Sequence, residues 1–108
     1  MTGFYCIKLV KNDAVIARAP SEQIISLEGH WYFPPECVDT TRLISSDRLY
    51  TCPEKGTSFW VDLHMDKLYF NDIAWVYPAE TTKPDYQYIA NYYGFFPEHQ
   101  LYYYEKCN

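Results

Sequence analysis

Hydrophobic and polar residues alternate over many short stretches of this chain, and that pattern predicts β-strands. Residues 4–10 form the first stretch. A polar turn at residues 11–13 and a second stretch at residues 14–17 complete a predicted hairpin. The pattern recurs at residues 22–27, 30–33, 47–52, 57–63, 67–70, 73–77 and 101–105, and residues 39–46 fit either a loop or a short strand.

These strands are expected to present different side chains on their two faces, because successive residues in a strand point to opposite sides. In residues 30–33, His30 and Tyr32 share one face, while Trp31 and Phe33 share the other. In residues 57–63, one face is made up of Phe59, Val61 and Leu63. A turn at residues 71–72 is predicted to separate the last two strands of this meander.

One stretch follows the period of a helix instead. Asp85 suits a helix N-cap and Gly94 suits a helix stop. Between them the apolar residues Tyr86, Ile89, Ala90 and Tyr93 recur at helical spacing. Residues 85–94 therefore predict one short helix.

The aromatic content supports a fold built mostly from sheet. It reaches 19%, with 12 Tyr, and aromatic residues are favoured in strands. Short strands joined by closely spaced turns are typical of barrels and sandwiches. We therefore expect a mainly β fold, a small antiparallel barrel- or sandwich-like meander of about eight strands with one short helix in the C-terminal half. The length of 108 residues suits a single domain, residues 1–108.

The charge balance excludes one class of partner. The net charge is −5 and the nine basic residues are scattered, whereas bulk nucleic-acid binding needs clustered Lys and Arg.

No apolar run long enough for a membrane span and no signal-peptide pattern is found. We expect a soluble, cytoplasmic protein with no cofactor. His30, His64 and His99 lie in separate segments, so no metal site is expected.

The four cysteines are Cys6, Cys37, Cys52 and Cys107. No two of them form the closely spaced pair of a zinc site. Without a secretory signal, disulfides are not expected either. We interpret Cys6, Cys37 and Cys107 as small apolar filler or exposed thiols.

Candidate chemistry concentrates in the turn at residues 50–56. It brings together the thiol of Cys52, the amine of Lys55 and the turn residues Pro53 and Gly56. Aromatic segments at residues 29–35 and 72–78 suggest one pocket shared with this turn. The candidates for catalysis are Cys52, Lys55 and His30, and the predicted ligand-binding residues are His30, Tyr32, Lys55, Asp72, Trp75 and Tyr77.

Each candidate also has a purely structural interpretation. Cys52 is either a nucleophile activated by a nearby cation or a small core residue at a strand end. Lys55 binds either a ligand anion or a protein carboxylate, for which Glu36, Glu54 and Asp72 are the options considered. His30 is either a general base or a partly buried, hydrogen-bonded side chain. Asp72 suits a turn cap, and Trp75 and Tyr77 are either core rings or pocket walls.

Four segments in order, residues 28–36, 52–56, 72–78 and 89–97, closely resemble a family known only as a domain of unknown function, number 427. The resemblance covers about residues 14–105 and implies a mainly β fold. It assigns no roles to the matching positions His30, Tyr32, Cys52, Pro53, Lys55, Gly56, Asp72, Trp75, Tyr77 and Pro78. The family is sometimes also labelled a nucleotidyltransferase family, but the Gly-Ser pair and spaced carboxylates of such enzymes are missing from this sequence.

Three hypotheses for function follow. The favoured one is a binding module that holds a small polar or anionic ligand in an aromatic pocket around His30, Cys52, Lys55 and Trp75. The second is a small enzyme, a transferase or hydrolase, that uses Cys52 or Lys55 with His30. The third is a protein-interaction domain whose matching residues are all structural. The run of tyrosines at residues 102–104 also predicts an aromatic strip suited to weak homo-oligomerisation.

Overall fold

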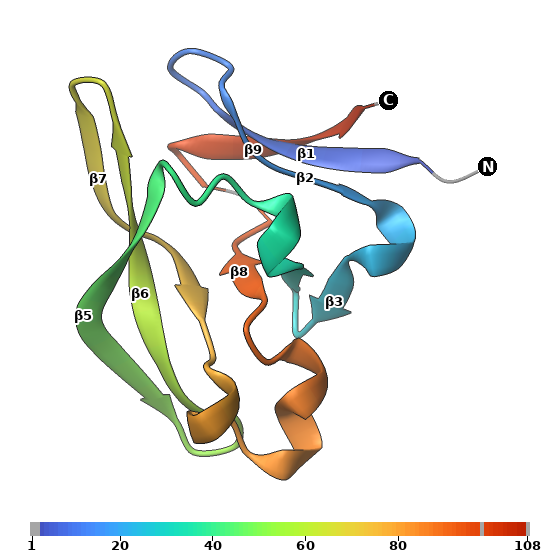
Figure 1. Cartoon of the computed structure of the whole chain (residues 1–108). Coiled ribbons are helices and arrows are strands. Elements are labelled where there is room, and N and C mark those ends of the chain that lie inside the picture. The colour runs from blue at the N-terminus through green and yellow to red at the C-terminus, as the bar shows by residue number, and fades with distance from the viewer. Residues whose placement is uncertain (1–2, 98, 108) are drawn as a thin grey trace.

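The computed structural model of the protein describes residues 3–97 and 99–107. Within these residues nine strands form two antiparallel sheets, so the prediction of a mainly β fold is confirmed (Figure 1). The smaller sheet crosses the top of the view in Figure 1. Its strands are, in spatial order, β2 (Val15–Pro20), β1 (Phe4–Leu9) and β9 (Tyr102–Cys107).

The larger sheet joins two groups of strands. Its spatial order is β3 (Ile25–Leu27), β4 (His30–Phe33), β8 (Tyr93–Phe95), β7 (Leu68–Val76), β6 (Gly56–Met65) and β5 (Leu43–Cys52). Strand β8 pairs with both β4 and β7 and so connects the early hairpin to the later one. As a result, segments far apart in the sequence share one sheet face.

The main core lies where the two sheets meet. Ile7 and Ile16 of the smaller sheet and Val61, Ile73 and Phe95 of the larger sheet are fully buried in one cluster. Burying a side chain of this size stabilises the fold by about 1.5–3 kcal/mol. The predicted apolar face of β6 belongs to this cluster, which confirms the alternation inferred for that strand.

A second, smaller cluster forms on the opposite face of the larger sheet. Tyr32, Trp75, Tyr77 and Ile89 are its buried members. The 3-10 turns η3 (Ala79–Thr81) and η4 (Pro84–Ile89) lie at the bottom of Figure 1, and Ile89 from η4 joins the cluster. Strand β4 contributes to both clusters, because Tyr32 and Phe33 point to opposite faces.

The predicted helix at residues 85–94 is wrong. Pro84 opens a 3-10 turn that ends at Ile89, and Asn91, with a positive φ of 68°, redirects the chain into β8. Gly94 lies within β8 and does not stop a helix. Ile89 and Tyr93 have the spacing of neighbours on one helix face, but in the structure they contact different clusters. In the described part of the chain, no helix is long and apolar enough to cross a bilayer.

The predicted turn at residues 71–72 is also wrong, because β7 runs through it. Asp72 has a positive φ of 57°, and the register with β6 shifts there, as in a β-bulge. The carboxylate of Asp62, which is 5% exposed, accepts a hydrogen bond from the Asp72 N–H at 2.9 Å. Arg48 forms ion pairs with both carboxylates. Asp72 therefore belongs to a network that fixes a bulge.

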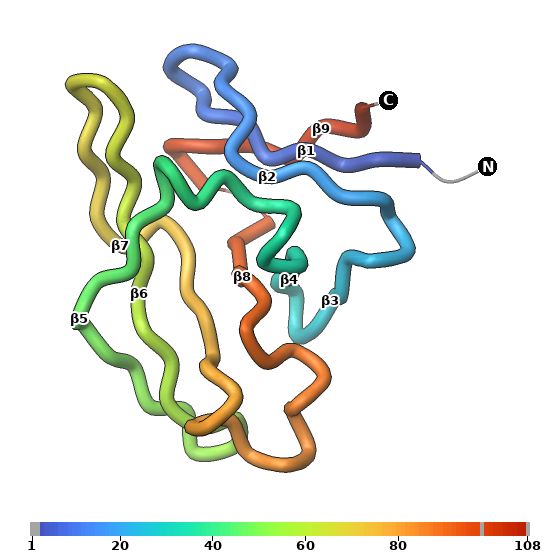
Figure 2. The backbone as a smooth tube through the Cα atoms, in the orientation of Figure 1, coloured from blue at the N-terminus to red at the C-terminus, as the bar shows by residue number. Residues whose placement is uncertain are grey.

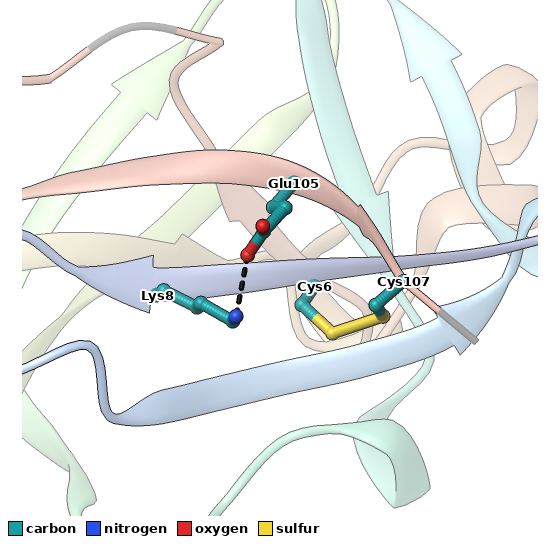
Figure 3. Close-up of a disulfide and its surroundings, with 4 residues drawn as sticks. All are labelled: Cys6, Lys8, Glu105 and Cys107. Atoms are coloured by element: carbon teal, nitrogen blue, oxygen red, sulfur yellow. Dashed lines mark ion pairs between the residues drawn. A yellow bond between two sulfur atoms is a disulfide. The ribbon is translucent and has the colours of Figure 1, made fainter.

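A disulfide joins Cys6 to Cys107, contrary to the expectation that the cysteines stay reduced (Figure 3). Strand β1 pairs with β9 so that Cys6 faces Glu105 and Phe4 faces Cys107. The two cysteines are thus diagonal neighbours on one sheet face, with Cα atoms 6.3 Å apart. Pairing of the first and last strands, traced in Figure 2, creates this proximity across 101 residues of sequence. Cys37 and Cys52 are free thiols.

The tyrosine run at residues 102–104 is largely engaged within the domain. Tyr102 is fully buried and its hydroxyl accepts the Phe96 N–H at 2.8 Å. The Tyr104 ring stacks on Trp31 with centroids 4.4 Å apart. The hydroxyl of Tyr103 donates to Asp13 at 2.9 Å. Weak homo-oligomerisation through this strip stays a prediction.

Candidate functional site

A cavity of about 310 Å³ opens on the side of the larger sheet that carries the second cluster. This volume lies at the lower end of the range of small-ligand pockets. Its lining comprises Glu28, His30, Tyr32, Tyr50, Cys52, Lys55, Ser58, Trp60, Trp75, Tyr77 and Phe96. The lining includes six of the seven candidate catalytic and ligand-binding residues predicted from the sequence, all except Asp72.

Aromatic rings form most of the wall, and Trp75 is their centre. Its ring centroid lies 4.8 Å from that of Phe96, 5.0 Å from that of His30 and 6.1 Å from that of Trp60, in edge-to-face geometries. The Trp75 indole N–H donates to the Tyr32 hydroxyl at 3.2 Å. The indole also lies against Gly94, where a Cβ atom would come within 2.4 Å of it. These contacts hold the indole in one orientation.

Lys55 supplies the positive charge of the cavity. Although it follows a strand end, it is only 7% exposed. Its ammonium pairs with the carboxylate of Glu28, lies 4.0 Å from the Cys52 sulfur and stands 5.3 Å from the centre of the Tyr86 ring. Burial by itself lowers the pKa of Lys55, but the hydrogen bond to Glu28 and the nearby Cys52 outweigh it. The pKa is therefore raised, and Lys55 stays protonated.

The turn that carries Lys55 is held in place by its backbone. Gly56 has a φ of 117°, a value that suits glycine, and a Cβ there would meet the Thr81 carbonyl oxygen at 2.0 Å. The Lys83 N–H donates to the Lys55 carbonyl at 2.8 Å, and the Thr81 hydroxyl donates to the Thr57 carbonyl at 2.7 Å. The predicted pairing of β5 and β6 across this turn is confirmed by the register of Cys52 with Gly56.

Glu28 reaches the cavity from a tight turn between β3 and β4. Glu28 and Gly29 both have positive φ, and Leu27 pairs with His30, as in a two-residue hairpin loop. The Glu28 side chain is 47% exposed, whereas that of Lys55 is 9% exposed. The ion pair therefore joins a buried, fixed cation to a carboxylate that has ready access to water.

Burial also shifts the pKa of two other groups of the wall, His30 and Tyr77. Burial lowers the pKa of His30, the Glu28 carboxylate opposes this effect, and the Lys55 ammonium adds to it. Burial raises the pKa of Tyr77 to about 12. His30 packs its ring against Trp75 and Phe96. In this arrangement it is a wall residue that can offer one donor and one acceptor.

Asp72 is the predicted site residue that does not line this cavity, because it pairs with Arg48 elsewhere on β7. The acidic partner of Lys55 is Glu28, which was not among the options considered from the sequence. The missed wall residues are Glu28, Tyr50, Ser58, Trp60 and Phe96. Alternation along residues 57–63 was a usable signal for Ser58 and Trp60, which share a face.

Among the residues that the structure describes, no cluster of three or more His, Cys, Asp or Glu is placed to hold a metal ion.

The profile of a family described as a domain of unknown function, DUF427, matches residues 5–106 of the chain. This match confirms the resemblance inferred from the four motifs and extends it from residue 14 back into the first strand. No curated protein matches the chain.

Proposed function

The chain belongs to the DUF427 family, whose function is unknown, and from its site we propose that it binds a small polar or anionic ligand in the cavity around Lys55. One observation carries the proposal. A buried ammonium stands at the wall of a cavity otherwise lined largely by aromatic rings. Sites for small molecules are mostly apolar and use a few converging polar groups for orientation.

The ion pair with Glu28 is a weak reason to keep a lysine at this position. Partly exposed pairs contribute little to stability, about 0–1 kcal/mol, and Glu28 is half exposed. Withdrawing the Lys55 ammonium from water opposes folding. Groups kept at some cost to stability are typical of functional sites. A ligand anion at Lys55 accounts for the arrangement better than a structural ion pair does.

Replacing Lys55 with methionine tests this proposal. We expect Lys55→Met to abolish the binding of benzoate, used as an anionic probe, because the cation that attracts the carboxylate is gone. Stability should change by less than about 1 kcal/mol, since Glu28 returns to water when its partner is removed. Binding is measured by NMR through the shift of the Trp75 indole N–H, and stability by denaturant unfolding.

Lys67→Met is the matched control, because Lys67 is exposed in the turn between β6 and β7. This variant should bind benzoate like the parent. Equal binding by the Lys55→Met variant would refute the role of Lys55. A loss of about 3–5 kcal/mol in the Lys55→Met variant would instead mark Lys55 as one half of a structural pair.

The distance of 4.0 Å between the Lys55 ammonium and the Cys52 sulfur favours a second candidate, an enzyme that uses Cys52 as nucleophile. A catalytic thiol of this kind is largely ionised and reacts faster than a free thiol, of which only a few per cent is ionised at pH 7. On the binding proposal we expect Cys52 to react with iodoacetamide within about tenfold of the rate of glutathione.

Mass spectrometry of the alkylated protein, with Cys52→Ser to identify the site, measures this rate. A rate more than about tenfold above that of glutathione, lost in the Lys55→Met variant, would support the enzyme in place of the binding module.

A further inference from the structure

We propose that the ligand is a small organic carboxylate with a flat, apolar body, and that its carboxylate replaces Glu28 as the partner of Lys55. This inference rests on the proposed binding function. It adds the charge class of the ligand and identifies the protein group that the ligand displaces.

The two members of the ion pair differ in how freely they can move. Lys55 is held by its backbone, through Gly56 on one side and the bond from Lys83 on the other, and its side chain is 9% exposed. Glu28 lies on a two-residue loop and is 47% exposed. Glu28 can therefore swing into water, while the Lys55 ammonium stays in the wall and needs a replacement anion.

The charge of the cavity favours a monoanion. Lys55 is the cation of the wall, and His30 beside it is uncharged because burial lowers its pKa. A phosphate group, with nearly two negative charges and three acceptor oxygens, is suited to a cluster of arginines or several backbone donors. A single ammonium matches a carboxylate, and Glu28 already places a carboxylate on it.

The rings around the cavity favour a flat, apolar ligand body. Trp60 and Trp75 meet at 75° with centroids 6.1 Å apart, so the edge of one indole faces the other. Phe96 and Tyr50 add further ring surface to the wall, and Tyr50 is 51% exposed. An aromatic ring placed among them gains edge-to-face and stacked contacts. Lys55 lines the same cavity and is available to the acidic end of such a ligand.

The test titrates the intact domain with benzoate, benzamide and phenyl phosphate, each followed by the Trp75 indole N–H signal. We expect benzoate to bind at least about tenfold more tightly than the other two. Glu28→Gln should tighten benzoate binding by about tenfold and leave benzamide unchanged, because the competing carboxylate is removed and the free form of Lys55 becomes more populated. Glu54→Gln, at an exposed position beside Lys55, removes the same charge and should leave benzoate binding unchanged.

Glu28→Asp provides a second variant that suits the fold, since Asp-Gly is favoured in two-residue hairpin loops. Its shorter side chain holds Lys55 less well and should also tighten benzoate binding. Unchanged benzoate affinity in both Glu28 variants would overturn the displacement of Glu28. Equal binding of benzamide, or tighter binding of phenyl phosphate, would overturn the carboxylate class and leave the binding function standing. If none of the three compounds shifts the Trp75 signal, the proposed function itself fails.

Discussion

Replacing Cys6 with serine lowers the free energy of unfolding by about 3–5 kcal/mol. The disulfide from Cys6 to Cys107 spans 101 residues, so it ties nearly the whole chain into one loop. Chain-entropy models assign about 4.7 kcal/mol to a closed loop of about 100 residues, because the cross-link restricts the unfolded chain. Losses of this size are a large fraction of the stability of a small domain.

Denaturant unfolding of the oxidised parent and of the Cys6→Ser variant measures this effect. Cys37→Ser, which removes a free thiol, is the control and should stay close to the parent. A reducing agent should bring the parent down to the stability of Cys6→Ser and leave the variant unchanged. Equal stability of the parent with and without reductant would contradict the prediction.

The disulfide also supports one wall of the cavity. It fastens β9 to β1, and the buried Tyr102 at the start of β9 accepts the Phe96 N–H at 2.8 Å. Phe96 in turn lies 4.8 Å from Trp75, between ring centroids. Loosening β9 thus weakens a contact that positions the wall ring Phe96.

Replacing Gly56 with alanine has the second large effect, a loss of about 2–6 kcal/mol. Two penalties add at this position. The φ of 117° is strained for any residue with a Cβ, at about 1–3 kcal/mol. The new Cβ would also stand 2.0 Å from the Thr81 carbonyl oxygen, and such overpacking costs about 1–3 kcal/mol when backbone must move.

Gly29→Ala is the matched control, since Gly29 also has a positive φ, 81°, but a Cβ there meets nothing within 4 Å. It carries only the conformational penalty, about 1–2 kcal/mol. Thermal or denaturant unfolding of both variants isolates the contact of the 53–56 turn with η3. Losses of equal size would mean that this turn does not press on Thr81 as the structure indicates.

Much of the candidate site was accessible from local sequence pattern. Alternation in β4 places His30 with Tyr32, and alternation along residues 73–77, which end just after β7, places Trp75 with Tyr77, on the face that carries the cavity. The turn after Cys52 was predicted from the residue types of Pro53 and Gly56. These inferences hold because strand geometry and turn conformation depend on residues close together in the sequence.

The errors arose where distant segments decide local structure. The spacing of Ile89 and Tyr93 suited a helix, but Pro84 starts a 3-10 turn and β8 must pair with β4 and β7. Asp72 has a residue type common in turns, yet its N–H bonds to the buried Asp62 and β7 continues through it. Tertiary pairing overrode local propensity at both positions.

By itself, the sequence determined the mainly β class, most strands, their two faces and four of the ring-bearing residues at the cavity, His30, Tyr32, Trp75 and Tyr77. Only the tertiary structure decided that Cys6 meets Cys107, that Glu28 is the partner of Lys55 and that Asp72 lies outside the cavity lining. The reason is physical. Alternation specifies which way a side chain points, but the register between strands far apart in the chain, set by packing of the whole core, specifies what it meets.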